Sequence, residues 1–271
     1  MKTKKTLLMT AMAVVMFGFA SCTKETSKPA EEVAGTYEGY TLATSDYFSD
    51  MFTADESVVF TMVNDNTVKI DFTSSTWGTF SFGEALVEGK EAPYKVTGSG
   101  KCQMVGMGGQ ASEYDCILEA TINGNGADVM TFSLPAVMGG TTLTFKQGDA
   151  PLCYYVAGKY EGTLSYGVGE MDDVEATVEL KEQGGDKISI VLPSIGEGMM
   201  TIPEFTLTDI TISTTDRKVF AIAETEISQT VGTTNYTGTL SGEVNNGVLT
   251  LNYAMKPGAM PMSINFTFVG E

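Results

Sequence analysis

The chain has 271 residues, with 34 Asp and Glu against 16 Lys and Arg, so its formal net charge at pH 7 is −18. Such a charge repels nucleic acids, and the single arginine, Arg217, leaves little to bind phosphate. There is no histidine, which removes Ser-His-Asp and Cys-His catalysis and the usual zinc ligand sets. The densest acidic segments, 46–56 and 172–173, lack the pattern of a calcium loop, and we interpret them as solvated. We therefore expect no enzymatic activity, no cofactor, no metal and no nucleic-acid partner.

Residues 1–21 have the pattern of a signal peptide. A basic start with three lysines precedes an apolar run from Leu7 to Phe19, which is too short to span a bilayer. The segment Phe19-Ala20-Ser21-Cys22 resembles the lipobox of bacterial lipoproteins, in which the cysteine is acylated and becomes the new N-terminus. Ordinary cleavage that leaves Cys22 as a free thiol is the alternative. The resemblance implies a lipid anchor in the outer membrane, facing the periplasm or the cell surface, and a mature chain of net charge −21.

Residues 22–32 are polar and lack apolar periodicity, which predicts a flexible tether. The chain then repeats itself, because Val33-Ala34-Gly35-Thr36-Tyr37-Glu38-Gly39 returns as Val156-Ala157-Gly158-Lys159-Tyr160-Glu161-Gly162, 123 positions later. This period is too long for a solenoid and predicts two tandem domains, 33–150 and 156–271. We expect each domain to fold around its own core.

Both repeats show the period-two alternation of half-buried strands, most clearly from Val174 to Lys181. Turn sequences such as Asn245-Asn246-Gly247 separate the runs. Eight strands per repeat fit either a sandwich or an up-and-down barrel, and closure is favoured because it removes sheet edges. The expected strands are near 33–43, 56–64, 67–73, 79–88, 93–104, 112–123, 127–134 and 140–147, then 156–166, 172–182, 186–192, 199–213, 217–230, 234–245, 247–254 and 259–269.

The openings Gly35-Thr36-Tyr37 and Gly158-Lys159-Tyr160 resemble the Gly-x-Trp motif that begins the first strand of lipocalins, with Tyr in place of Trp. Together with the lipobox, they resemble more closely the calycin-like β-barrel lipoproteins of the Bacteroidetes group. The resemblance implies an all-β fold of two tandem eight-stranded up-and-down calycin/lipocalin-like antiparallel barrels. The resemblance implies a fold and a location in the cell envelope, but no enzymatic reaction.

Three cysteines follow the lipobox. Cys102 and Cys116 flank a glycine-rich turn, so a hairpin there would place them opposite each other and permit a disulfide in an exported protein. Two buried free thiols are the alternative. Cys153 lies at the junction of the repeats, and we expect it to remain reactive.

We expect a non-enzymatic envelope lipoprotein that binds a small apolar or glycan ligand through its barrels. Four small residues on adjacent strands, Ala221, Ala223, Gly238 and Gly242, would leave space inside the second barrel. Trp77 either stacks on a ligand at a barrel rim or packs in the core.

The alternative is a structural or adhesive surface protein with solid barrels, which binds a macromolecule through its loops. Bulky side chains at other inward positions favour such a packed core: Leu180, Ile188, Ile190, Leu251, Phe266 and Phe268.

Overall fold

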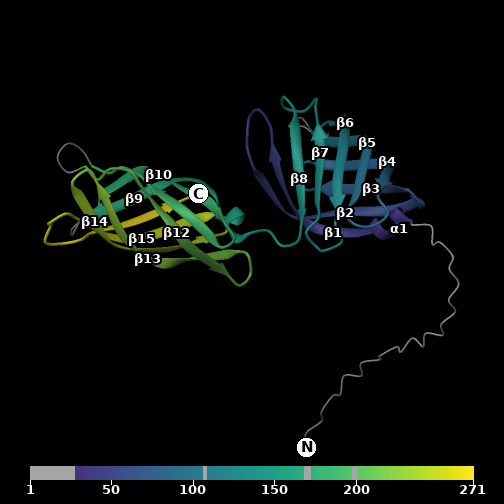
Figure 1. The fold of residues 1–271 in the computed structure, drawn as a ribbon. Coiled ribbons are helices and arrows are strands. Elements are labelled where there is room, and N and C mark those ends of the chain that lie inside the picture. Colours follow the sequence, from purple (N-terminus) through teal and green to yellow (C-terminus); the bar gives the residue numbers. More distant parts are fainter. Residues whose placement is uncertain (1–27, 106–108, 168–171, 197–200) are drawn as a thin grey trace, which may run out of the picture.

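The structure, a computed structural model, describes residues 28–105, 109–167, 172–196 and 201–271. It consists of two closed antiparallel barrels of eight strands each, joined in tandem (Figure 1). The predicted signal peptide, the lipidation site Cys22 and the tether up to residue 27 lie outside the described residues. Within the described part of the chain, no helix has the length and hydropathy needed to cross a membrane.

Each strand pairs with the next along the chain, and each barrel closes by pairing its last strand with its first. The predicted meander barrels are therefore confirmed over the sandwich. The first barrel consists of β1 (Gly35–Thr44), β2 (Met51–Asn64), β3 (Thr67–Ser74), β4 (Gly78–Glu88), β5 (Tyr94–Val105), β6 (Ala111–Ile122), β7 (Val129–Leu134) and β8 (Thr141–Gln147). The second consists of β9 (Gly158–Gly167), β10 (Asp172–Gly184), β11 (Lys187–Leu192), β12 (Phe205–Thr214), β13 (Val219–Val231), β14 (Thr234–Asn245), β15 (Val248–Pro257) and β16 (Ile264–Gly270).

One strand begins well before its predicted start. β2 starts at Met51 rather than near residue 56, because a β-bulge interrupts its alternation: Ala54 and Asp55 together lie opposite Tyr40 of β1. Asp55 has a φ of 55°, in the left-handed region that Asp tolerates better than most residues. The bulge turns the Asp55 side chain outward and breaks the pattern from which strands are predicted.

Side chains fill the interiors of both barrels. In the first barrel, the rings of Phe72, Phe80 and Phe132 pack with centroids 4.9–5.5 Å apart. In the second barrel, the core is mainly aliphatic, and all six bulky residues predicted to point inward are at most 2% exposed. This packing agrees with the expectation that an eight-stranded barrel is just wide enough to be filled by its own side chains.

A short helical turn closes the base of each barrel. Helix α1 (Pro29–Val33) buries Ala30 and Val33 in the first core, and the 3₁₀ helix η1 (Leu152–Tyr155) buries Cys153 in the second. The Ala30 amide donates to the Asp65 carbonyl, and the Cys153 amide donates to the Gly185 carbonyl. The end of the predicted tether and the segment between the two predicted domains therefore each form a lid that packs on the following barrel.

The repeated heptapeptide is explained by contacts that both barrels share. The Tyr37 hydroxyl donates to the Val33 carbonyl at 2.7 Å, and the Tyr160 hydroxyl donates to the Val156 carbonyl at 2.8 Å. These bonds fix each lid to the first strand of its barrel. The last glycine of the motif has a different role, because the backbone of the neighbouring strand passes where a Cβ would be.

The predicted disulfide is not formed. Cys102 lies opposite Tyr114 and Cys116 opposite Gly100, so the two cysteines are diagonal rather than facing. Diagonal pairs are about 7–8 Å apart, beyond the span of a disulfide. Burial raises the pKa of Cys102 to about 11 and that of Cys116 to about 12, which keeps both thiols protonated. Cys153 is fully buried, and a buried thiol is inaccessible to reagents. The expectation that it remains reactive therefore does not agree with the structure.

Candidate functional site

Aromatic side chains join the two barrels at the linker. The ring centroids of Phe52 on β2 and Tyr155 on η1 are 5.0 Å apart. Tyr155 also stacks on Phe220 of β13, with ring centroids 5.7 Å apart. Next to them, Tyr40 and Leu42 point outward from β1. Both are buried, because residues of the linker pack against them. One edge-to-face contact and one stacked contact therefore connect the outer face of the first barrel to the second.

A tight turn between β12 and β13 holds the single arginine against this interface. The Thr214 hydroxyl accepts the Arg217 amide at 2.9 Å, and the Asp216 carboxylate accepts the amides of Lys218 and Val219. Those two backbone bonds lower the pKa of Asp216. They hold Arg217 at a φ of 56°, an uncommon conformation that marks a constrained site.

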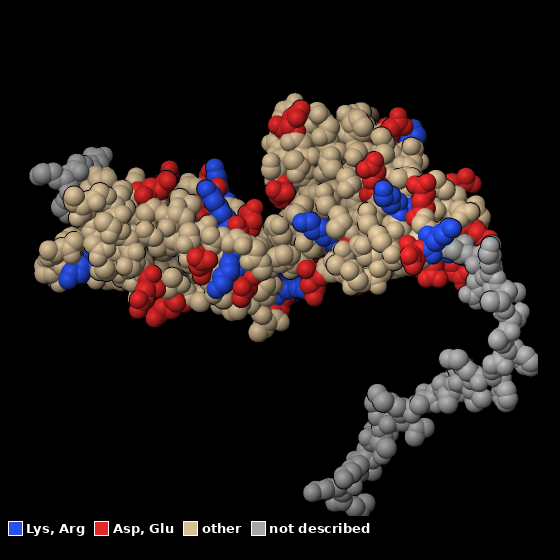
Figure 2. Space-filling view, in the orientation of Figure 1, with Lys and Arg blue, Asp and Glu red and all other residues tan. Residues whose placement is uncertain are grey.

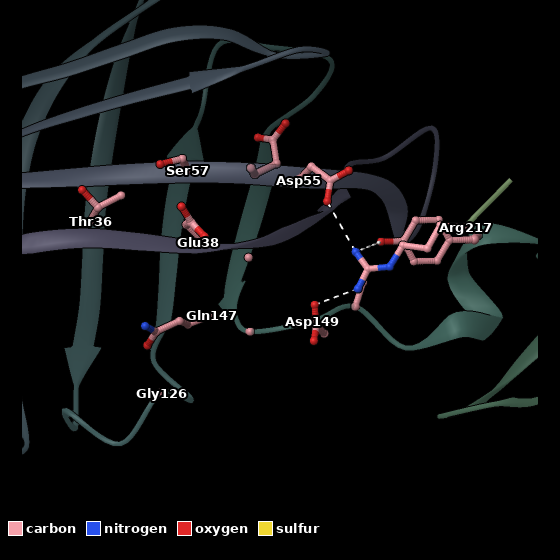
Figure 3. Close-up of a pocket in the computed structure, with 13 residues that line it drawn as sticks. Thr36, Glu38, Asp55, Ser57, Gly126, Gln147, Asp149 and Arg217 are labelled. Carbon is pink, nitrogen blue, oxygen red and sulfur yellow. Dashed lines mark hydrogen bonds and ion pairs between the residues drawn. The ribbon is translucent and has the colours of Figure 1, made fainter. Parts of the chain in front are cut away.

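The Arg217 guanidinium bridges the first barrel and the linker (Figure 3). It lies 3.6 Å from the Asp55 carboxylate, donates to Asp149 at 2.7 Å, and lies over the Tyr155 ring at 5.7 Å from its centroid. The hydrogen bond with Asp149 contributes most to raising the pKa of Arg217, which therefore stays charged. The β-bulge at Asp55 and the turn at Arg217 thus present two constrained residues to each other.

These contacts border a polar cleft of about 640 Å³ between the barrels, which we call the inter-barrel cleft. The side chains of Thr36, Glu38 and Ser57 make no hydrogen bond or ion pair with any described residue. The cleft thus combines unpaired acceptors and hydroxyl groups with a guanidinium that is already paired. Its lining consists of Thr36, Glu38, Gly39, Asp55, Glu56, Ser57, Gly126, Gln147, Gly148, Asp149, Ala150, Tyr155 and Arg217.

Two of the predicted ligand-binding residues do not point into the second barrel. Ala221 and Ala223 are exposed on the outer face of β13, so their predicted inward orientation was wrong. Phe220 and Ile222 are buried and pair in register with β14, so regular alternation along β13 places the two alanines on the outer face.

Gly238 and Gly242 do not create a cavity either. A Cβ on Gly238 would lie 1.8 Å from the Ala254 carbonyl oxygen, and one on Gly242 would lie 2.2 Å from that of Thr250. Both glycines accommodate the close approach of β15 rather than empty space.

Trp77 belongs to the core rather than to an exposed rim. It is 3% exposed, and its ring packs on Phe48 with centroids 5.6 Å apart. The core alternative for Trp77 is therefore the one seen in the structure.

Glu56 is a buried carboxyl, so the expectation that the acidic segment 46–56 is solvated was wrong for this residue. It is 3% exposed, and its Oε1 atom accepts the Ser74 hydroxyl at 3.1 Å and the Ser75 amide at 3.3 Å. Its Oε2 atom has no partner. Burial raises the pKa of Glu56 against the effect of these hydrogen bonds. In the part of the chain that the structure describes, no group of three or more Asp, Glu or Cys side chains is placed to hold a metal ion.

Sequence reasoning also missed the inter-barrel cleft, because its parts are far apart in the chain. Asp55 and Arg217 are 162 positions apart and come from different repeats. Two features of the sequence could have drawn attention to this region: the single arginine and the repeated glutamates Glu38 and Glu161. Neither feature shows which carboxylates the arginine contacts.

Comparison with known proteins agrees with the barrels. A family model described as a calycin-like beta-barrel domain matches residues 33–147 and 156–271. A solved structure from Bacteroides fragilis NCTC 9343, a proposed outer membrane protein, is 30% identical, with a TM-score of 0.78, over 90% of this chain and 99% of the other. A DUF3598-family protein of unknown function from Nostoc punctiforme PCC 73102 is 14% identical over 91% and 98% of the two chains, but its TM-score of 0.27 supports no inference.

None of the curated proteins compared with the chain matches it. The family model covers most of the chain twice, and the Bacteroides fragilis structure spans both barrels. The chain therefore belongs to the calycin-like β-barrel family and contains two of its domains in tandem.

Proposed function

We propose that this chain is a lipid-anchored outer-membrane protein that binds a neutral, hydroxyl-rich ligand, such as a short glycan, in the inter-barrel cleft. The proposal rests on one observation: a polar cleft of about 640 Å³ at a domain interface, lined by unpaired hydroxyl and carboxylate groups. That volume is typical of ligand sites, which occur preferentially between domains. Carboxylates and hydroxyl groups are suited to accept and donate the hydrogen bonds of sugar hydroxyls.

Other ligand classes fit the cleft less well. An anion would meet Glu38, Asp55 and Asp149, while the one cation in the lining, Arg217, is already paired with two of these carboxylates. An apolar ligand would leave those polar groups without hydrogen bonds. The barrel interiors, where an apolar ligand was first expected, are filled by side chains.

Calorimetric titration of the mature, unlipidated chain with neutral oligosaccharides tests this proposal. We expect saturable binding, and at least a roughly tenfold loss of affinity in the Glu38→Ala/Ser57→Ala variant, because two hydrogen bonds are removed. Glu224→Ala is the matched control, since Glu224 is exposed on β13 away from the cleft. Equal affinities in all three proteins, or saturable binding of none of the neutral glycans, would reject the cleft as a glycan site.

The membrane location leads to a separate prediction. The lipobox resemblance and the likeness to a proposed outer membrane protein both support anchoring through Cys22. Cys22→Ala removes the acylated thiol, so we expect nearly all of the protein to leave the membrane fraction. Immunoblots of separated envelope and soluble fractions measure this. If the variant stays with the membrane while remaining folded, lipid anchoring is not what holds it there.

The adhesive function remains the second candidate. It is favoured by the filled interiors of both barrels, which leave only outer surfaces and loops for binding.

A further inference from the structure

Five buried residues lie together in the first barrel, where β1 and β3 end and β2 and β4 begin. The Ser74 hydroxyl donates to Oε1 of Glu56 at 3.1 Å and accepts the Trp77 amide at 3.1 Å. Thr41, on the inner face of β1, lies opposite Thr53 of β2. We call this group the Ser74 cluster: Thr41, Thr53, Glu56, Ser74 and Trp77.

Three atoms of the cluster are buried without a hydrogen-bond partner among the described residues: Thr41 Oγ1, Glu56 Oε2 and Trp77 Nε1. Each of the three residues is at most 3% exposed. An indole N–H only donates, a carboxylate oxygen only accepts, and a hydroxyl group does both. Buried polar groups of native proteins are nearly always hydrogen-bonded, so three orphaned groups of complementary kind in one network indicate a bound molecule that joins them.

The second barrel has apolar side chains at the corresponding positions. Leu164 follows Thr41 by 123 positions, and each pairs with a phenylalanine of the last strand of its barrel. Ala176 corresponds to Glu56, since each lies opposite the last glycine of the repeated heptapeptide. The second barrel closes with these apolar residues, so the fold itself does not require the polar groups of the Ser74 cluster.

Glu56 is also exceptional among the acidic residues. On the face drawn in Figure 2, acidic side chains lie on the outer surface of both barrels. In the part of the chain that the structure describes, only Glu56 and Asp128 are buried, and Asp128 accepts the Asn123 amide at 2.6 Å. Within the same segments, Oε2 of Glu56 is the only carboxylate oxygen that is buried without a partner.

We propose that the Ser74 cluster binds a hydroxyl oxygen, carried by a small alcohol or by water. A hydroxyl group accepts from Trp77 Nε1 and donates to Glu56 Oε2, and the Thr41 hydroxyl completes its hydrogen bonds in either role. An ammonium ion would leave the indole N–H unpaired, and an anion would be repelled by Glu56. One hydrogen bond does not replace the hydration of a carboxylate, so the cost of burying ionised Glu56 remains.

Trp77 is the only tryptophan of the chain, so its indole N–H gives a single nuclear magnetic resonance signal that reports on the cluster. In the ¹⁵N-labelled mature chain, we expect titration with methanol to shift this signal to saturation, or a nuclear Overhauser contact between the indole N–H and a long-lived bound water. Acetonitrile is the matched probe, because it accepts a hydrogen bond but cannot donate one to Glu56. It should cause no saturable shift.

Thr41→Val removes one hydroxyl group at nearly constant volume. It should weaken the apparent methanol affinity roughly tenfold, or abolish the water contact, because one buried hydrogen bond is lost. Thr61→Val is the matched control, since Thr61 is exposed on β2 of the same barrel and its exchange should change neither result.

The outcomes separate the two sources of the hydroxyl group. A saturable shift with methanol assigns it to an alcohol, and a water contact that methanol does not displace assigns it to water. The proposal is overturned if neither is seen, if acetonitrile and methanol act alike, or if Thr41→Val and Thr61→Val give equal results. The comparison of probes on the original chain does not depend on any variant folding. Neither Thr41 nor Trp77 lines the inter-barrel cleft, so failure here would leave the glycan proposal untouched.

Discussion

Gly39→Ala should strongly destabilise the first barrel. A Cβ at this position would lie 2.1 Å from the Lys146 carbonyl oxygen and 2.9 Å from the Phe145 ring, so the β1–β8 seam that closes the barrel must open. Overpacking of this kind costs roughly 1–3 kcal/mol, and displacement of backbone places Gly39 at the upper end of that range. For a domain of this size, we expect the melting temperature to fall by roughly 10 °C.

Gly83→Ala is the matched control, because Gly83 lies on β4 of the same barrel with no atom within 4 Å of its Cβ position. It should leave the melting temperature unchanged or raise it slightly, since alanine restricts the unfolded chain more than glycine does. Thermal unfolding followed by circular dichroism compares the two. If both variants have the same melting temperature as the original chain, the close approach of the backbone at Gly39 does not limit barrel closure.

Glu56→Gln should stabilise the protein at neutral pH. The Glu56 carboxyl is buried with Oε2 unpartnered, and burial raises its pKa above the ordinary value of 4.5. The folded state therefore binds the proton more tightly than the unfolded state does. Below pH 4.5 Glu56 is protonated in both states and does not reduce the free energy of unfolding. As the pH rises through the folded-state pKa, the carboxyl ionises in the folded protein and stability is lost. Glutamine removes that loss, and the expected gain at pH 7 is roughly 1–3 kcal/mol.

The pH dependence distinguishes this mechanism from a general effect of removing charge from an acidic protein. Chemical unfolding at pH 4 and pH 7 should show Glu56→Gln stabilising only at the higher pH. Glu84→Gln is the control, because Glu84 is exposed on β4 of the same barrel, so its exchange should change stability little at either pH. A gain of the same size at both pH values, or no gain at pH 7, would show that Glu56 carries no desolvation cost.

Much of the candidate site could not be predicted from local sequence. The bulge at Asp55 hid the start of β2, and the register of β5 with β6 placed Cys102 and Cys116 diagonally instead of face to face. A one-residue change in register moves a side chain to the other face of a sheet. Ala221 and Ala223, which were expected inside the second barrel, point outward because Phe220 and Ile222 occupy the inward positions of β13.

The sequence by itself determined that the chain is all-β, that it contains two copies of one barrel, and that it carries the pattern of a lipid anchor. These properties depend on short-range patterns: the alternation of buried and exposed positions, the turn residues, and a motif repeated at a fixed offset. Only the tertiary structure decided which polar side chains from distant parts of the chain come into contact. Arg217 reaches Asp55 and Asp149 because the linker aromatics fix one barrel against the other, and Glu56 is buried because β2 and β3 close over it. Such contacts join residues far apart in the chain, so no local pattern encodes them.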